Sequence, residues 1–200
     1  MLTRVSNIEV YRDWMHWSPL FDGDVEPTVE QIVDRITKDE PSEAMKAGSA
    51  FHLALENAQN GSHAEFAADG YMFRLPDAEL SLPDIRELRA YQAYGDLTVT
   101  GKVDGLDGKI IIDHKTTAKV DLDRYLEGCQ WRFYLDIFEA DVFRWIVWPI
   151  REVATRVYAV AEPQVLEARR YPELHQDCVA LADEYLAFAR QMNLPNARID

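Results

Sequence analysis

The chain has 200 residues, 48% of them hydrophobic, which suits a single globular domain spanning residues 1–200 with a full core. Its net charge of −14 argues against non-specific attraction to nucleic acid, although nine of the 21 Lys and Arg residues lie between Lys102 and Arg156. Two cysteines without a C-x-x-C spacing exclude a disulfide framework, a zinc site and an iron–sulfur cluster, and the lack of a long apolar run or a signal peptide predicts a cytoplasmic protein without a membrane span.

The first third of the chain predicts two helices after an irregular start. Residues 1–27 are rich in aromatic side chains and show no regular period, so we expect irregular structure there. Thr28 and Gln31 form a capping-box pattern that begins a helix ending near Asp39. A second helix is expected from Pro41 to about Asn60, with an apolar stripe beside a polar face.

The rest of the chain alternates between strand and helix patterns. The expected elements are mixed loop and short strand at 62–82, strands at 85–94, 97–106 and 109–115, a helix at 122–138, strands at 141–149 and 153–161, and helix at 163–192 interrupted at Tyr171-Pro172. This order predicts an α/β fold in which a mixed β-sheet, with a central three-strand meander, is flanked by helices.

Residues 101–117 carry the strongest functional signal in the chain. They predict a β-hairpin with Asp107-Gly108 as a two-residue turn, because this dipeptide favours a type I′ turn. That register pairs Leu106 with Lys109 and Lys102 with Asp113.

The hairpin is expected to group two acids and a lysine. Alternate residues of a strand share a face, so Asp104, Asp113 and Lys115 should point the same way, with the two acids about 7 Å apart. Two carboxylates at that separation can bind one divalent cation beside an ammonium group, which suits phosphodiester hydrolysis. The alternative is a set of ordinary surface charges, partly balanced by Lys102.

A third acid joins this face if the preceding hairpin is regular. A turn at Gly95-Asp96 pairs Tyr94 with Leu97 and therefore places Glu87 opposite Asp104. Directly opposed acids repel, so a cation or a lysine should neutralise them. A bulge in the hairpin would move Glu87 to the other face.

Three further features accompany the hairpin. His52 lies on the polar side of the second expected helix, although a lone helical histidine is more often a surface residue. Gln130 and Tyr134 stand four residues apart on the helix after the hairpin. The polar residues 113–116 follow three isoleucines and so emerge at the end of a buried strand.

Together these motifs resemble the PD-(D/E)xK nuclease superfamily. The order G-x-x-x-H, G-x-V-D, I-I-I-D-x-K-T and Q-x-x-x-Y covers residues 47–148 and is most similar to the branch that holds the RecB nuclease domain and the phage recombination exonucleases. Residues 1–40 and 163–200 lie outside this match, as N-terminal and C-terminal elaborations of a restriction-endonuclease-like core. Val103 replaces the motif's proline, and the cluster cysteines of the CRISPR adaptation nucleases and any helicase motif are absent.

The resemblance implies a role for each matched residue. Asp104, Asp113, the His114 backbone carbonyl and His52 would bind Mg²⁺ or Mn²⁺, with Glu87 as a weaker candidate; Lys115 would orient or deprotonate the attacking water, and Gln130 and Tyr134 would contact the substrate. We expect the DNA to be held by four basic residues around the metal face: Lys102, Lys119, Arg124 and Arg132.

The function implied is an Mg²⁺-dependent deoxyribonuclease, an ATP-independent exonuclease of phage-recombination type. Its partners would be duplex DNA ends, a single-strand annealing protein and further copies of the chain, in a bacterial cell or encoded by a phage. Two alternatives remain open: a catalytically weak DNA-end-binding or regulatory protein that keeps the fold, and an unrelated metal-binding scaffold in which the motif is accidental.

Overall fold

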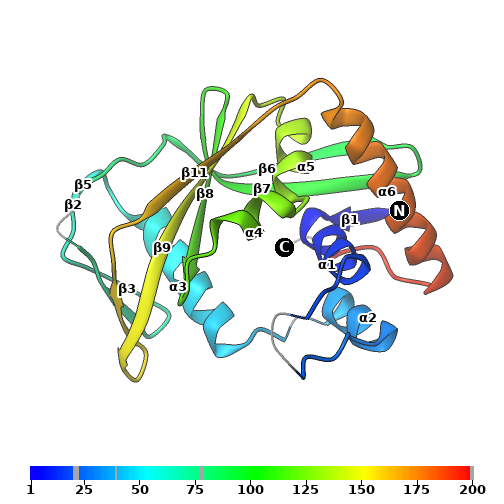
Figure 1. The fold of residues 1–200 in the computed structure, drawn as a ribbon. Coiled ribbons are helices and arrows are strands. Elements are labelled where there is room, and N and C mark those ends of the chain that lie inside the picture. The colour runs from blue at the N-terminus through cyan, green and yellow to red at the C-terminus, as the bar shows by residue number, and fades with distance from the viewer. Residues whose placement is uncertain (20–22, 39, 77–78, 199–200) are drawn as a thin grey trace.

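The computed structural model describes residues 1–19, 23–38, 40–76 and 79–198 (Figure 1). The helices of these residues are α1 (Val5–Met15), α2 (Val29–Thr37), α3 (Glu43–Asn57), α4 (Leu122–Glu127), α5 (Gln130–Ile137) and α6 (Leu174–Gln191). The strands are β1 (Leu2–Arg4), β2 (Gly61–Ser62), β3 (Glu65–Ala68), β4 (Tyr71–Arg74), β5 (Glu79–Leu80), β6 (Ile85–Tyr94), β7 (Leu97–Asp107), β8 (Ile110–Thr117), β9 (Val142–Ala154), β10 (Val157–Val160) and β11 (Gln164–Arg169).

A mixed sheet organises the molecule. Within the described residues its main path runs β1-β7-β8-β9-β10-β4-β3, with β6 paired to β7 and β11 paired to β9. The pairs β1–β7, β8–β9 and β10–β4 are parallel, and the other pairs are antiparallel. The strands β6, β7 and β8 form the expected three-strand meander, and α4 and α5 make the crossover from β8 to the parallel strand β9.

Two hydrophobic clusters pack against this sheet. The larger cluster joins α1, α2, α5 and α6 to the meander and β9, and it includes the fully buried Leu97 and Phe143. The smaller cluster joins α3 to β3 and β4 through Phe51, Phe66 and Phe73. Figure 1 shows α3 apart from the other helices. The smaller cluster therefore packs α3 on the sheet separately from the helices of the larger cluster.

The meander follows the expected strands, but the second hairpin is shifted by one residue. Asp107 pairs with Ile110, so the loop is Gly108-Lys109 and not Asp107-Gly108. Gly108 has φ +56°, which glycine adopts without strain. Two-residue hairpin loops also accept glycine at their first position. The first hairpin has the expected turn, because Tyr94 pairs with Leu97.

The helices α2 and α3 begin where the sequence predicts. Thr28 and Gln31 form both hydrogen bonds of the capping box at the start of α2. This helix ends at Thr37, and Asp39, where its end was expected, lies outside the described residues. Ser42 caps α3, which ends at Asn57.

The expectation of irregular structure was wrong for residues 2–15, whereas the described residues 16–19 and 23–27 belong to no helix or strand. Residues 2–15 form β1 and α1, and β1 joins the sheet by pairing in parallel with β7. The helix α1 lacks a side-chain N-cap, so its start carries no capping signal. It buries Val5, Ile8 and Tyr11 in the larger cluster.

The second half of the chain departs from the expected elements at two places. The helix expected at 122–138 is divided into α4 and α5, because Glu9 of α1 accepts hydrogen bonds from the backbone N–H groups of Cys129 (2.7 Å) and Gln130 (2.8 Å) and so caps a new helix there. Residues 164–169, expected to be helical, form β11 along β9. No helix of the described residues is long and apolar enough to cross a membrane.

Candidate functional site

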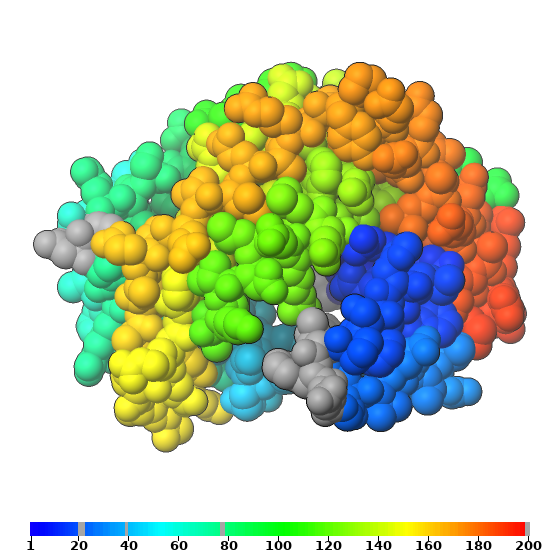
Figure 2. Space-filling model, viewed as in Figure 1, coloured from blue at the N-terminus to red at the C-terminus, as the bar shows by residue number. Residues whose placement is uncertain are grey.

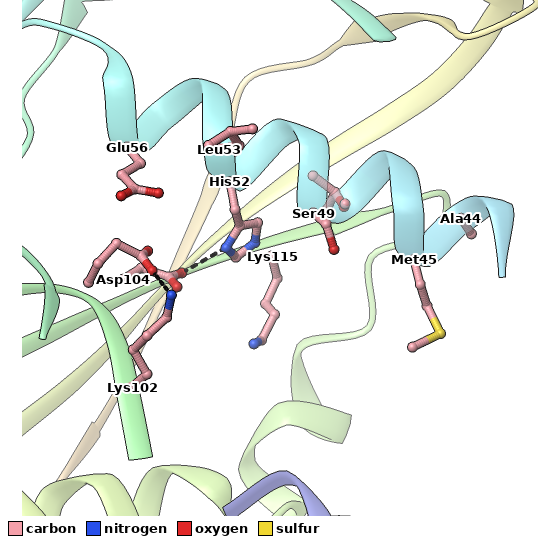
Figure 3. Close-up of a pocket in the computed structure, with 12 residues that line it drawn as sticks. Ala44, Met45, Ser49, His52, Leu53, Glu56, Lys102, Asp104 and Lys115 are labelled. Atoms are coloured by element: carbon pink, nitrogen blue, oxygen red, sulfur yellow. Dashed lines mark ion pairs between the residues drawn. The ribbon is translucent and has the colours of Figure 1, made fainter. Parts of the chain in front are cut away.

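One pocket gathers residues from α3, β6, β7 and β8. It has a volume of about 650 Å³, and its lining includes Ser49, His52, Asp104, Lys115 and Thr116. Figure 3 shows Ser49, His52, Asp104 and Lys115 between α3 and the strands below it, with Lys115 extended into the open space. On the outside, the surface is hollowed between α4 and the N-terminal helices (Figure 2).

His52 and Asp104 meet across the space between α3 and β7. The Nδ1 atom of His52 lies 3.2 Å from Oδ2 of Asp104, and the same oxygen accepts a hydrogen bond of 2.7 Å from the His114 backbone N–H. Burial disfavours a charged His52, but the Asp104 carboxylate outweighs it, so the pKa of His52 is raised. His52 is therefore next to the proposed metal ligand Asp104.

Asp113 lies beneath the pocket with Lys115 as its partner. The Lys115 Nζ atom donates to Oδ1 of Asp113 at 3.0 Å, and the Asp113 side chain is only 7% exposed. The second oxygen, Oδ2, is buried and has no hydrogen-bond partner among the described residues. A buried carboxylate oxygen without a partner is costly, so a cation or a hydrogen-bond donor bound at this atom would stabilise it.

The two aspartates have opposite electrostatic environments. Burial opposes the charge on Asp104, but His52, Lys115 and the His114 N–H outweigh it and lower its pKa to about 2. Burial raises the pKa of Asp113 to about 6, against the attraction of Lys115 and with added repulsion from Asp104. The Asp104 carboxylate is therefore stable as an anion, whereas that of Asp113 needs a further cation.

Lys115 keeps its proton in this environment. Burial opposes its charge, but the carboxylates of Asp113 and Asp104 outweigh that effect and raise the pKa of Lys115 above its ordinary value. The ammonium group can therefore donate hydrogen bonds and supply positive charge at neutral pH. It cannot act as a base at neutral pH while the carboxylates of Asp104 and Asp113 are both ionised and bind no other cation.

Glu87 and Lys102 form an ion pair at the edge of the same pocket. The register of β6 and β7 is continuous from Leu88–Val103 to Arg86–Gly105, which brings Glu87 level with Asp104. Glu87 has φ +54°, in the left-handed region that non-glycine residues rarely adopt, and it is missing from the ladder pairs. Both residues thus lie at the pocket, where each neutralises the other.

His114 presents its backbone to Asp104 and its side chain to the smaller cluster. Its Nδ1 atom accepts a hydrogen bond of 3.1 Å from the Trp148 indole N–H, and burial lowers the pKa of His114 to about 4. The imidazole is therefore neutral, with its proton on Nε2. Trp145 and Trp148 are 2% and 3% exposed, so both belong to the core.

Tyr134 lies behind the pocket, packed on β7. Its hydroxyl donates to the Lys102 carbonyl at 3.1 Å, its ring stacks on Phe143, and burial raises its pKa to about 12. A Cβ atom on Gly101 would lie 2.3 Å from this ring, which explains the glycine of the G-x-V-D motif. Tyr134 and the nearby Gln130 do not line the pocket, so the expected substrate contact has no direct support in their position.

The expected DNA-binding residues are divided between two places. Lys119 and Arg124 are exposed on the segment that leads from β8 into α4. Arg132 does not belong to the metal face, since it lines a separate cavity with Cys129 and Cys178 and its guanidinium lies over the Trp131 ring. The structure therefore places Arg132 away from the pocket of Asp104 and Lys115, and its contact with DNA stays a prediction.

The donor atoms at the pocket suit a hard divalent cation, but they are not preassembled. Carboxylate oxygens and one imidazole are donors that Mn²⁺ accepts, and Mg²⁺ prefers the oxygens. The unpartnered Oδ2 of Asp113 supports such a ligand. Among the described residues, however, no three His, Cys, Asp or Glu side chains already form a metal-binding group, because His52 and Lys115 pair with the carboxylates.

Sequence reasoning gave no role to two hydroxyl groups of this pocket. Ser49 precedes His52 by three residues and therefore shares its helix face, and Thr116 follows Lys115 on β8. A Cβ atom on Gly48 would lie 3.2 Å from the Thr116 hydroxyl, so α3 approaches β8 closely at this point. The helical spacing from His52 is the signal that could have identified Ser49.

Comparison with known proteins supports the fold. No family model matches the chain, and no curated protein matches it either. A solved structure from Eubacterium rectale, named as a putative exonuclease, matches with a TM-score of 0.55 and 14% identity over 96% of this chain and 81% of the other. A second structure, of a protein named SSO0001, matches with a TM-score of 0.47 and 14% identity over 93% of this chain and 75% of the other.

The architecture and the first of these matches agree with the expected fold class. The chain has an α/β fold with a restriction-endonuclease-like core, in which a mixed sheet with a central meander is flanked by helices. At 14% identity this likeness concerns the fold alone.

Proposed function

We propose that this protein is a metal-dependent nuclease that hydrolyses phosphodiester bonds in DNA. One observation carries the proposal: His52, Asp104 and Lys115 converge on one pocket, above the buried Asp113 carboxylate whose Oδ2 has no partner. The fold shared with a structure named as a putative exonuclease supports the same class of activity by analogy.

The proposed metal ligands are Asp104, Asp113, His52 and the His114 backbone carbonyl, with Glu87 as a further candidate. Mg²⁺ or Mn²⁺ bound there would supply Lewis-acid chemistry, acidifying a water and neutralising charge on the phosphate. The low pKa of Asp104, about 2, keeps its carboxylate ionised and available as a ligand. Asp113 would be released from its single partner, Lys115, when a second cation shares its charge.

Lys115 is proposed to stabilise the reacting phosphate. Its raised pKa keeps the ammonium protonated, so it can hold the attacking water by a hydrogen bond and offset negative charge that develops on the phosphate. A role as the base that takes the proton requires the pKa of Lys115 to fall, which follows only if bound cations neutralise both aspartates.

The narrower proposal is an ATP-independent exonuclease of phage-recombination type. Its substrate would be duplex DNA ends held by Lys102, Lys119 and Arg124, and its partners a single-strand annealing protein and further copies of the chain. This identity rests on the sequence resemblance, which is an analogy between families.

Digestion of end-labelled linear DNA and closed-circular DNA tests the activity. We expect loss of label from the linear DNA with Mg²⁺ or Mn²⁺, none with EDTA, and intact closed circles. Asp104→Ala should abolish digestion, while the exposed Asp107→Ala serves as the matched control on the same strand. Digestion that persists in EDTA or in Asp104→Ala would contradict the proposal.

A DNA-end-binding protein without catalysis is the second candidate. It is favoured by the pairing of the acids, since Asp104, Asp113 and Glu87 each have a cationic partner or a histidine within the chain. Retention of linear DNA in a gel without digestion, in any divalent ion, would support this candidate.

A further inference from the structure

The end of α3 is held by an arginine from another strand. The Nη1 atom of Arg86, on β6, donates to the carbonyl oxygens of Leu55 (3.3 Å), Glu56 (2.8 Å) and Ala58 (2.9 Å). The last carbonyls of a helix have no partner within the helix, so these bonds satisfy groups that would otherwise face water. Arg86 thus supplies a C-terminal cap from outside the helix.

The helix does not provide this cap itself. Its last turn contains no basic residue, and its C-cap, Ala58, has an extended backbone in place of a left-handed glycine. A cation at the C-terminal end of a helix is also favoured by the helix dipole. The guanidinium of Arg86 therefore provides both the missing charge and the missing donors.

This contact connects the two sides of the proposed metal site. His52 lies one turn before Glu56 on α3, and Arg86 pairs with Gly105, the residue directly after Asp104 on β7. The arginine therefore joins the strand position next to Asp104 to the helix turn next to His52. The distance of 3.2 Å between His52 and Asp104 depends on how α3 lies over that strand position.

We infer that Arg86 is a positioning residue for His52: it fixes α3 against β6 and β7 so that the imidazole faces the metal site beside Asp104. The inference rests on the proposed function, because it assigns His52 to metal binding. Arg86 itself is not a metal ligand, since a guanidinium offers N–H donors and no acceptor and its Nη1 donates to carbonyl groups.

The test is a double-mutant cycle on Mn²⁺ affinity, measured by titration calorimetry of the full chain without DNA. Arg86→Gln should weaken Mn²⁺ binding by about tenfold, within the range that supporting residues of metal sites typically contribute. In a His52→Ala background, the same substitution should change the affinity by less than about twofold. Arg86→Lys should restore most of the affinity, because an ammonium also donates to carbonyl groups.

Arg170 provides a matched control. Its Nη1 donates to the Leu135 carbonyl at 2.7 Å at the end of α5, away from the pocket, so Arg170→Gln should lower stability without altering Mn²⁺ affinity. Unchanged affinity in Arg86→Gln, or an equal loss in the His52→Ala background, would overturn the inference. If Arg86→Gln does not fold, the cycle is run with Arg86→Met, which keeps the aliphatic stem and removes the donors. A loss of Mn²⁺ affinity is then expected only when His52 is present, and its absence would overturn the inference.

The outcomes separate this inference from the proposed function. Failure of the unsubstituted protein to bind Mn²⁺ would contradict the metal site itself and therefore both. The unsubstituted protein could instead bind Mn²⁺, lose this binding in Asp104→Ala and keep it in Arg86→Gln. That result would contradict only the role of Arg86.

Discussion

At Asp113 the requirements of folding and of the proposed chemistry conflict. The side chain is buried near Asp104, its Oδ2 has no partner, and its pKa is raised to about 6. A carboxyl group with a raised pKa in the folded state favours folding when protonated and opposes it when ionised. The contribution of Asp113 to the stability of the metal-free protein should therefore fall as the pH rises from about 4 toward 6.

Asp113→Asn should remove this pH-dependent loss. In EDTA at pH 8, we expect its Tm to exceed that of the unsubstituted protein by several degrees, and the difference should vanish near pH 4. Thermal unfolding followed by circular dichroism across this range measures it. The exposed Asp107→Asn is the control and should show no such trend; an Asp113→Asn Tm below that of the unsubstituted protein at pH 8 would refute the argument.

At the scale of the elements, the contact between α5 and β7 leaves no room for a single added methyl group. Gly101 lies directly under the Tyr134 ring, and that ring is fixed by Phe143 and by a bond to the Lys102 carbonyl. Gly101→Ala should therefore displace α5 from the sheet and destabilise the protein by about 1–3 kcal/mol, as overpacking typically does.

Denaturant unfolding measures this loss against a milder glycine substitution. Gly48→Ala places a Cβ atom 3.2 Å from the Thr116 hydroxyl, which can give way, and alanine favours the helix. We expect Gly48→Ala to change stability by less than about 1 kcal/mol. Equal losses in the two variants would show that the Tyr134 contact is not the cause.

The sequence predicted the elements whose signals are local and missed those created by tertiary contacts. The capping box at Thr28 and the turn at Gly95 act within a few residues, so α2 and the first hairpin were predicted correctly. The strand β11 has a composition that also favours helix, and only its pairing with β9 decides its conformation. The cap that Glu9 places on α5 comes from a residue more than 100 positions away.

The distinction between local signals and tertiary contacts also explains which parts of the candidate site were predicted. The predicted hairpin loop was one residue too early, so the predicted pairing partners of β7 and β8 were wrong. Asp104, Asp113 and Lys115 still share one face, because Asp113 and Lys115 are alternate residues of one strand. Arg132 lies away from the pocket, on a helix whose start depends on Glu9, which no local pattern reveals. The contacts of Arg86 cross from a strand to a helix and leave no mark in the spacing of residues.

For the whole molecule, the net charge of −14 restricts how DNA could be held. The exposed Lys119 and Arg124 lie on the segment that leads from β8, the strand of Lys115, into α4. If this segment holds DNA, replacing both with Gln should weaken DNA binding and lower the slope of log affinity against log salt by about two. Mn²⁺ affinity should not change. Binding titrations with labelled duplex DNA at several salt concentrations measure this slope.

Lys38 and Arg190 form the matched control pair. Both are partly exposed, and they form ion pairs with Asp34 and Asp96, away from the pocket. Their replacement by Gln should leave the slope within about 0.5 of the original value. A larger effect from this pair than from Lys119 and Arg124 would place the DNA-binding surface elsewhere.

The central claim is that His52, Asp104, Asp113 and Lys115 form a metal-dependent hydrolytic site in which the acids bind the ion and the lysine does not. Single-turnover DNA cleavage and Mn²⁺ affinity, measured together for Asp113→Asn and Lys115→Met, test it most directly. We expect Asp113→Asn to lose both, and Lys115→Met to lose at least about 100-fold in cleavage rate while binding Mn²⁺ with unchanged or higher affinity. Cleavage by Asp113→Asn at the rate of the unsubstituted protein would contradict the account.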